Sequence, residues 1–133
     1  MKKIKIAILG AGRIAGHHIK ALKKDKNFQL ISICDLVEKK AHHYRKGSIS
    51  IYKNFDQMII DHPEIDIVAI MSPSGMHYEH AIRIIVKYKK HVIIEKPIVM
   101  RLDQLSKLYH VAKKNKCKIF PVYQNRYNLA VRK

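Results

Sequence analysis

Apolar runs and amphipathic stretches alternate along the whole chain. Short runs rich in β-branched residues predict buried strands, and apolar residues spaced three or four positions apart predict helices. Strands are expected at residues 3–9, 28–34, 48–52, 65–71, 91–94 and 118–123. Helices are expected between them, at residues 13–24, 36–46, 55–61, 75–88 and 102–116.

This alternation predicts a parallel sheet, because parallel neighbours must be joined by crossover connections. The run 65–71 is almost entirely apolar, which indicates that helices cover both faces of the sheet. We therefore expect an α/β fold with a doubly wound parallel Rossmann sheet of six strands, in the order 3-2-1-4-5-6. The 133 residues suffice for one such domain, which we place at residues 1–123.

A glycine-rich turn follows the first strand. The sequence Gly10-Ala11-Gly12-Arg13-Ile14-Ala15 matches G-x-G-x-x-G/A in the strand–turn–helix context of dinucleotide binding. Gly10 allows the tight turn, Gly12 lets a pyrophosphate approach the backbone, and Ala15 lets the helix pack closely on the sheet. The helix N-terminus offers free N–H groups to the phosphates. We predict that the cofactor is bound here by Gly10, Gly12, Arg13, Ile14 and Ala15.

An acidic residue, Asp35, ends the second strand. A carboxylate at this place accepts hydrogen bonds from the adenosine ribose and repels a 2′-phosphate, which favours NAD over NADP. The alternative is that Asp35 caps the N-terminus of helix 36–46. Lys39 and Lys40 follow closely and would weaken the discrimination, so NADP stays open as the less favoured cofactor.

A turn, Ser72-Pro73-Ser74-Gly75, follows the fourth strand. Ligands of doubly wound sheets bind beside the strand ends at the switch point of the strand order, which lies next to this strand. We predict that Ser72, Pro73 and Ser74 line the cofactor cleft. The turn also suits an N-cap of the following helix, and the two roles are compatible.

The charge balance is unusual, with 27 Lys+Arg against 10 Asp+Glu and a formal net charge of +17. Nucleic-acid binding is one explanation, but the basic residues are scattered over several helices without a nucleic-acid-reading motif. Compositional drift in a sequence rich in Lys and Ile is favoured over it. A third explanation is that the charge steers an anionic substrate.

Cysteine, histidine and the N-terminus restrict the class of protein further. Cys34 and Cys117 lie far apart in apolar runs and are expected to be buried free thiols. Adjacent histidines on a helix point in different directions, so the two His-His pairs predict no metal site. No apolar run is long enough for a signal peptide or a membrane span, and we expect a cytoplasmic protein.

The motifs occur in one order along the chain. The loop 10–15 and Asp35 are followed by Ser72-Pro73-Ser74 with His77, then by Glu95-Lys96-Pro97 and Gln124-Asn125-Arg126. Over nearly its whole length the chain resembles the glucose–fructose oxidoreductase / inositol dehydrogenase family (Gfo/Idh/MocA), which are NAD(P)-dependent sugar oxidoreductases. The tail 122–128 is similar to the branch that oxidises the 3-hydroxyl of UDP-N-acetylglucosamine or UDP-N-acetylglucosaminuronic acid for surface polysaccharides such as lipopolysaccharide.

The resemblance implies roles for single residues. Lys96 would be the catalytic residue, which hydrogen-bonds the reacting hydroxyl and assists its deprotonation; a lysine does this well only where burial or neighbours lower its pKa. Glu95 would lie near the nicotinamide ribose, and a cis bond is expected before Pro97. The other implied cofactor contacts are His77, Lys96, which would sit beside the nicotinamide, Gln124 and Arg126. The implied substrate contacts, to a nucleotide sugar, are Lys96, Arg126, Tyr127 and Asn128.

Family enzymes carry a second α/β domain that supplies most of the substrate pocket and the oligomer interface. We expect this C-terminal substrate domain to be absent here, with residues 124–133 beginning the connection to it. The chain would then be a fragment, a truncated gene product or one half of a two-chain enzyme, and a homo-oligomer where the second domain exists. The sequence favours the hypothesis that the chain is the NAD-binding half of a sugar dehydrogenase. The alternative is a non-catalytic nucleotide-binding module or remnant. Nucleic-acid binding is the least favoured of the three hypotheses.

Overall fold

The computed structural model describes residues 2–123. Within them six parallel strands form one sheet in the order β3-β2-β1-β4-β5-β6. This confirms the predicted doubly wound Rossmann topology. The strands are β1 (Ile4–Leu9), β2 (Phe28–Cys34), β3 (Ser50–Tyr52), β4 (Ile67–Ile70), β5 (His91–Ile94) and β6 (Ile119–Pro121).

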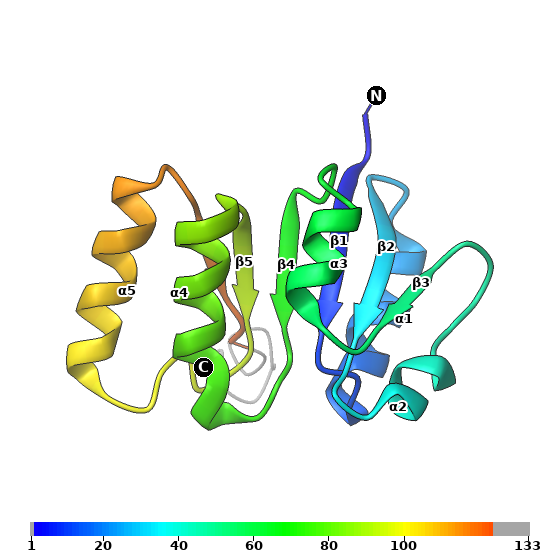
Figure 1. Cartoon of the computed structure of the whole chain (residues 1–133), viewed down its shortest axis with the longest axis horizontal. Coiled ribbons are helices and arrows are strands. Elements are labelled where there is room, and N and C mark those ends of the chain that lie inside the picture. Colours follow the sequence, from blue (N-terminus) through cyan, green and yellow to red (C-terminus); the bar gives the residue numbers. More distant parts are fainter. Residues whose placement is uncertain (1, 124–133) are drawn as a thin grey trace, which may run out of the picture.

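Helices cover both faces of the sheet. In Figure 1 the helices α3, α4 and α5 lie on the near side and α1 lies on the far side. Each side has its own apolar core, one containing Val68, Ile84 and Leu108 and the other containing Ile8 and Ala15. The helices are α1 (Arg13–Lys24), α2 (Glu38–His43), α3 (Phe55–Asp61), α4 (His77–Tyr88) and α5 (Leu102–Lys114), and a short 3₁₀ turn, η1 (Ser74–Met76), precedes α4.

Local sequence accounts for the helix and strand limits. All four residues of β4 are buried, as expected for a strand covered on both sides. Helix α4 buries Ala81, Ile84 and Ile85 on one face and ends at Lys89, which adopts the left-handed conformation with φ 56°. The Lys89 N–H donates to the Ile85 carbonyl at 3.1 Å, which closes the last turn.

Helix α2 begins later than predicted, and the reason lies in Asp35. The Val37 N–H donates to Asp35 Oδ1 at 2.7 Å, which makes a turn where the helix was expected to begin. The N-cap of α2 is Val37, and no side chain caps it. The alternative prediction that Asp35 caps this helix is therefore wrong.

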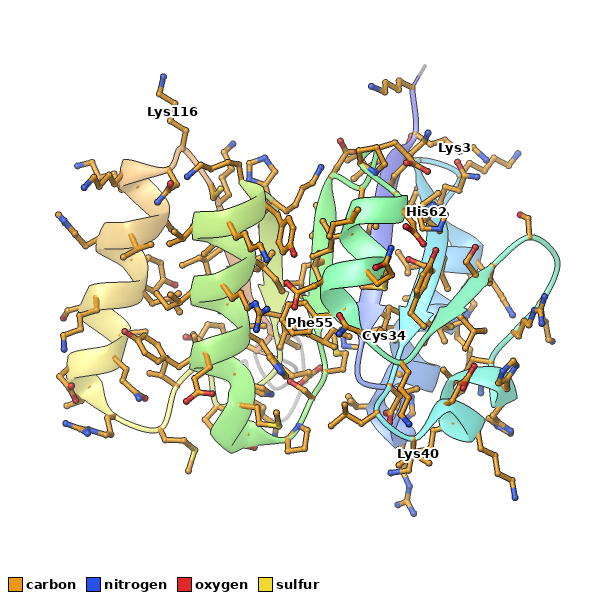
Figure 2. The ribbon with its side chains drawn as sticks, viewed as in Figure 1. Lys3, Cys34, Lys40, Phe55, His62 and Lys116 are labelled. Carbon is orange, nitrogen blue, oxygen red and sulfur yellow. The ribbon has the colours of Figure 1, made fainter. Side chains whose placement is uncertain are left out.

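Basic side chains project from widely separated parts of the surface. Figure 2 shows Lys3, Lys40 and Lys116 pointing outward at different edges of the molecule. In residues 2–123 no helix is long and apolar enough to cross a membrane. Nor do His, Cys, Asp and Glu side chains gather there in a group that would hold a metal ion.

Candidate functional site

A cleft of about 750 Å³ opens along the carboxyl ends of β1, β2, β4 and β5. This is the edge at which doubly wound sheets bind their ligands. Two predicted residues do not line the cleft, because Arg13 is exposed to solvent and Ala15 is fully buried on the face of α1 that packs into the core. The predicted residues that do line it are Gly10, Gly12, Ile14, Asp35, Ser72, Pro73, Ser74, His77, Glu95 and Lys96.

The glycine loop leaves room for a ligand above its second glycine. Gly10 has φ +101°, and a Cβ there would lie 2.5 Å from the backbone carbon of Met71. Nothing lies within 4 Å of the place where a Cβ on Gly12 would stand. Helix α1 begins directly after Gly12 without a side-chain cap and without an acidic residue in its first turn. Free N–H groups beside open space suit a phosphate group.

Asp35 ties this loop to the end of β2. Its Oδ2 accepts the Ala11 N–H at 2.8 Å, and its Oδ1 accepts the Val37 N–H at 2.7 Å. Each carboxylate oxygen can accept more than one hydrogen bond, so capacity remains for two ribose hydroxyls. Lys40 and Lys53 also line this part of the cleft, and their charges offset part of the repulsion that Asp35 exerts on anions.

The neighbouring thiol, Cys34, forms an inert part of the cleft wall. Burial raises the pKa of Cys34 to about 12, and the charge of Asp35 raises it in the same direction. A thiol in this state stays protonated at neutral pH and is a poor nucleophile. Cys34 therefore forms part of the cleft wall and is not expected to react.

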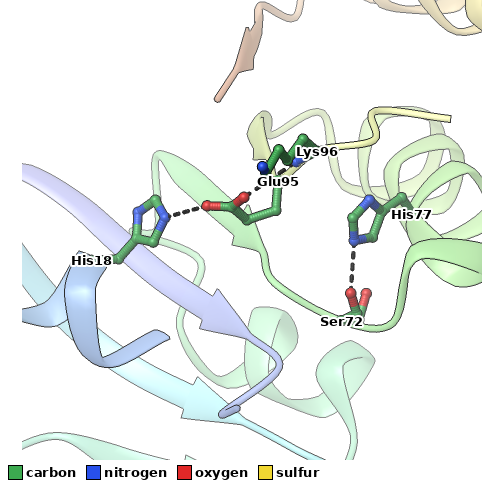
Figure 3. Close-up of polar contacts among 5 residues, drawn as sticks. All are labelled: His18, Ser72, His77, Glu95 and Lys96. Carbon is green, nitrogen blue, oxygen red and sulfur yellow. Dashed lines mark hydrogen bonds and ion pairs between the residues drawn. The ribbon is translucent and has the colours of Figure 1, made fainter. Parts of the chain in front are cut away.

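The turn after β4 is held by two histidines. The buried His77 ring lies between two backbone carbonyls, with Nδ1 2.7 Å from the Pro97 oxygen and Nε2 2.7 Å from the Ser72 oxygen. Figure 3 shows the second of these contacts. Ser72 Oγ lies 2.8 Å from His80 Nδ1. No side chain caps η1 or α4, so the alternative prediction of a hydroxyl cap at this turn is wrong.

Burial lowers the pKa of His80, which keeps its ring neutral at physiological pH. The ring packs edge-on against Phe55, with the two ring centroids 5.1 Å apart. The Ser72 hydroxyl is therefore fixed by a neutral partner at the cleft edge.

Glu95 and Lys96 lie at the end of β5, across the cleft from Asp35. Glu95 is 6% exposed, and its Oε1 lies 2.7 Å from His18 Nε2 on α1. Its Oε2 accepts the Lys96 N–H at 3.2 Å (Figure 3). The Lys96–Pro97 peptide bond is cis, as expected. The Lys96 side chain is exposed at the rim of the cleft.

Four predicted residues cannot be placed in this site. Gln124, Arg126, Tyr127 and Asn128 lie outside the described residues. Their proposed contacts with cofactor and substrate stay predictions.

Sequence reasoning missed several residues of the cleft. Lys53 and Asn54 directly follow β3 and line the cleft. The carboxyl ends of parallel strands share one edge of the sheet, and this rule alone would have predicted both residues as part of the cleft. Phe55 and Arg83 come together only because α3 packs beside α4, with the Arg83 guanidinium 5.5 Å from the Phe55 ring centre. The partner of Glu95, His18, lies 77 positions away in sequence, a separation that no spacing rule indicates.

The strand order, the open glycine turn and the carboxylate at the end of β2 define a dinucleotide-binding Rossmann domain. The sequence pattern of one oxidoreductase family with an NAD-binding Rossmann fold, GFO_IDH_MocA, matches residues 4–123. The chain belongs to this family, and its cofactor is NAD.

Two solved structures that are similar to this chain contain a sugar nucleotide. The WlbA dehydrogenase of Bordetella pertussis, solved with NADH and UDP-GlcNAcA, superimposes with a TM-score of 0.90 at 25% identity. Its counterpart from Chromobacterium violaceum, with the same ligands, gives a TM-score of 0.89 at 29% identity. Both superpositions cover 98% of this chain, but only 40% and 38% of the two enzymes.

A similar sequence belongs to a sugar-phosphate enzyme. The glucose-6-phosphate 3-dehydrogenase of Bacillus subtilis is 40% identical over 104 residues. The match covers 77% of this chain and 28% of that enzyme. The chain thus spans about a third of the length of its relatives, the part that carries the Rossmann domain.

Proposed function

We propose that this chain is the cofactor-binding half of an NAD-dependent dehydrogenase that oxidises the 3-hydroxyl of a UDP-N-acetylhexosamine or hexosaminuronate. Such a reaction would serve surface-polysaccharide synthesis in the cytoplasm. The observation that carries the proposal is the position of Lys96. It lies at the end of the cleft opposite Asp35, directly after a buried carboxylate.

Different residues of the cleft would bind the cofactor and transfer the proton. The open space at Gly12 and the N-terminus of α1 would hold the pyrophosphate, and Asp35 would hold the adenosine ribose. NAD, when bound, supplies the acceptor for the hydride that leaves the sugar carbon. Lys96 would hydrogen-bond the sugar hydroxyl and take its proton as the C–H bond breaks, so that a ketone remains.

The charge of the substrate supports the choice of substrate class. The two WlbA enzymes were solved with UDP-GlcNAcA, and the Bacillus enzyme is named for glucose-6-phosphate, so all these ligands are anions. A protein with a net charge of +17 attracts anions to its clefts. The exposed Lys96 side chain is available to a substrate that enters from solvent.

A second candidate is a nucleotide-binding module that does not catalyse a reaction. It is favoured by one observation, that the Lys96 side chain is exposed to solvent at the rim of the cleft. Such a module would bind NAD in the same cleft, and the two candidates therefore differ only in chemistry at Lys96.

Calorimetric titration with NAD and NADP is the first test. We expect NAD to bind more tightly than NADP, and an absence of NAD binding at millimolar concentration would contradict both candidates. Formation of NADH would then be followed spectroscopically with UDP-GlcNAcA, UDP-GlcNAc or glucose-6-phosphate present. Substrate-dependent NADH that Lys96→Met abolishes, with NAD affinity unchanged, supports the dehydrogenase. NAD binding without any substrate-dependent NADH supports the module.

A further inference from the structure

A partly buried hydrogen bond joins the two ends of the proposed cofactor site. His18 lies on α1, the helix that begins at the glycine loop, and its Nε2 lies 2.7 Å from Oε1 of Glu95. Glu95 stands directly before Lys96. Figure 3 shows the Glu95 side chain reaching from the Lys96 side of the cleft to His18.

We infer that His18 is a positioning residue, which fixes the Glu95 carboxylate beside the nicotinamide end of the cleft and thereby sets the relative affinity of the domain for NAD⁺ and NADH. The inference rests on the proposed function, because that function places the nicotinamide beside Glu95 and Lys96. Neither the glycine loop nor Asp35 can set this ratio, because the phosphates and the adenosine are the same in both forms of the cofactor.

The carboxylate depends on His18 because it has few partners. The Glu95 side chain is 7% exposed, and a carboxylate removed from water needs hydrogen bonds to stay charged. In residues 2–123 its partners are the His18 ring at 2.7 Å and the Lys96 N–H at 3.2 Å. The shorter contact, to a ring that can carry charge, is the stronger of the two.

The electrostatic consequence differs between the two forms of the cofactor. The nicotinamide ring is positively charged when oxidised and neutral when reduced. A fixed carboxylate in the cleft wall therefore stabilises NAD⁺ relative to NADH, and the effect is enhanced away from bulk water. Without His18, the Glu95 side chain would lose its shortest contact and could turn toward solvent, and this preference would be lost.

The test compares dissociation constants for NAD⁺ and NADH, measured by calorimetry and checked for NADH by its fluorescence. His18→Leu should weaken NAD⁺ relative to NADH by about tenfold. The matched control is His17→Leu, the exposed neighbour on the same helix, which should leave the ratio within about twofold of the wild type. His18→Gln, whose amide N–H can still donate to Glu95, should keep most of the wild-type ratio.

A double-mutant cycle tests whether His18 acts through Glu95. Glu95→Gln alone should change the ratio as His18→Leu does, and adding His18→Leu to it should change the ratio no further. Additive effects, or an unchanged ratio in His18→Leu, would overturn the inference. If His18→Leu does not fold, His18→Asn, which is too short to reach Glu95, takes its place with the same expectation. Binding of neither nucleotide by the wild type would instead count against the proposed function.

Discussion

At the scale of single residues, Gly10 and Gly12 are required for different reasons. Gly10 combines a φ of +101° with the close approach of Met71 and Ser72, so its side-chain position is filled by backbone. Gly12 has an ordinary φ of −77° and open space at its Cβ position. The fold requires the first glycine, and we propose that the second is required by the ligand alone.

This difference predicts two distinct outcomes for the same substitution. Gly10→Ala should destabilise the domain by roughly 2–4 kcal/mol, because a Cβ would clash with backbone in a left-handed conformation. Gly12→Ala should leave the free energy of unfolding within about 1 kcal/mol of the wild type and still weaken NAD binding. Urea unfolding and NAD titration of both variants measure the two effects. A stable Gly10→Ala protein, or a Gly12→Ala protein with wild-type affinity, would contradict the assignment.

At the scale of elements, Asp56 connects α3 to α4 at the edge of the cleft. It accepts from Arg83 Nη2 at 2.6 Å and from the Tyr88 hydroxyl at 2.5 Å, and Lys87 lies 3.7 Å away. The Asp56 side chain is only 16% exposed, so these contacts are partly shielded from water. They hold Phe55 and Arg83 against the cleft.

Replacing Asp56 should therefore loosen this helix pair. We expect Asp56→Asn to lower the free energy of unfolding by about 1–2 kcal/mol, because a charged acceptor of several hydrogen bonds is lost. The control is Asp103→Asn, which breaks an ion pair with Arg101 whose side chains are 47% and 71% exposed. Pairs of that kind contribute little, about 0–1 kcal/mol. If thermal unfolding shows the same loss of stability for both substitutions, the Asp56 contacts contribute no more to the free energy of unfolding than an exposed ion pair does.

The elements themselves were predictable where one local signal dominated. Helix α1 and strands β2 and β5 begin and end where apolar periodicity places them. The start of α2 was not predictable, because Asp35 accepts a hydrogen bond from the Val37 backbone and apolar periodicity does not reveal a side-chain hydrogen bond. The same holds for the site, where strand-end motifs were found but the His18–Glu95 contact, which only the packed fold creates, was not.

At the scale of the whole molecule, the net charge of +17 acts against folding. Like charges distributed over one small domain repel one another in the compact state, and this repulsion is screened by salt. Figure 2 shows Lys3, Lys40 and Lys116 far apart on the surface, so the repulsion is distributed over the molecule.

We therefore expect the melting temperature to rise by several degrees when sodium chloride is raised from about 20 mM to about 300 mM, where the screening length falls below about 10 Å. Differential scanning calorimetry at fixed pH measures the shift. The rise should level off as screening saturates, and choline chloride should reproduce it because screening does not depend on the cation. A melting temperature that falls with salt would mean that attractive pairs dominate.

The bond between Asp35 and Ala11 bears on how this domain could change its cofactor. A shift to NADP usually begins with loss of the acidic residue at the end of the second strand, to admit a phosphate on the ribose. Here the same carboxylate also anchors the backbone of the phosphate loop at 2.8 Å. A substitution that removes the acceptor oxygens of Asp35 is therefore expected to alter the choice of nucleotide and the order of the loop together. An evolutionary or engineered change of cofactor in this chain needs a compensating acceptor for the Ala11 N–H before NADP can be held well.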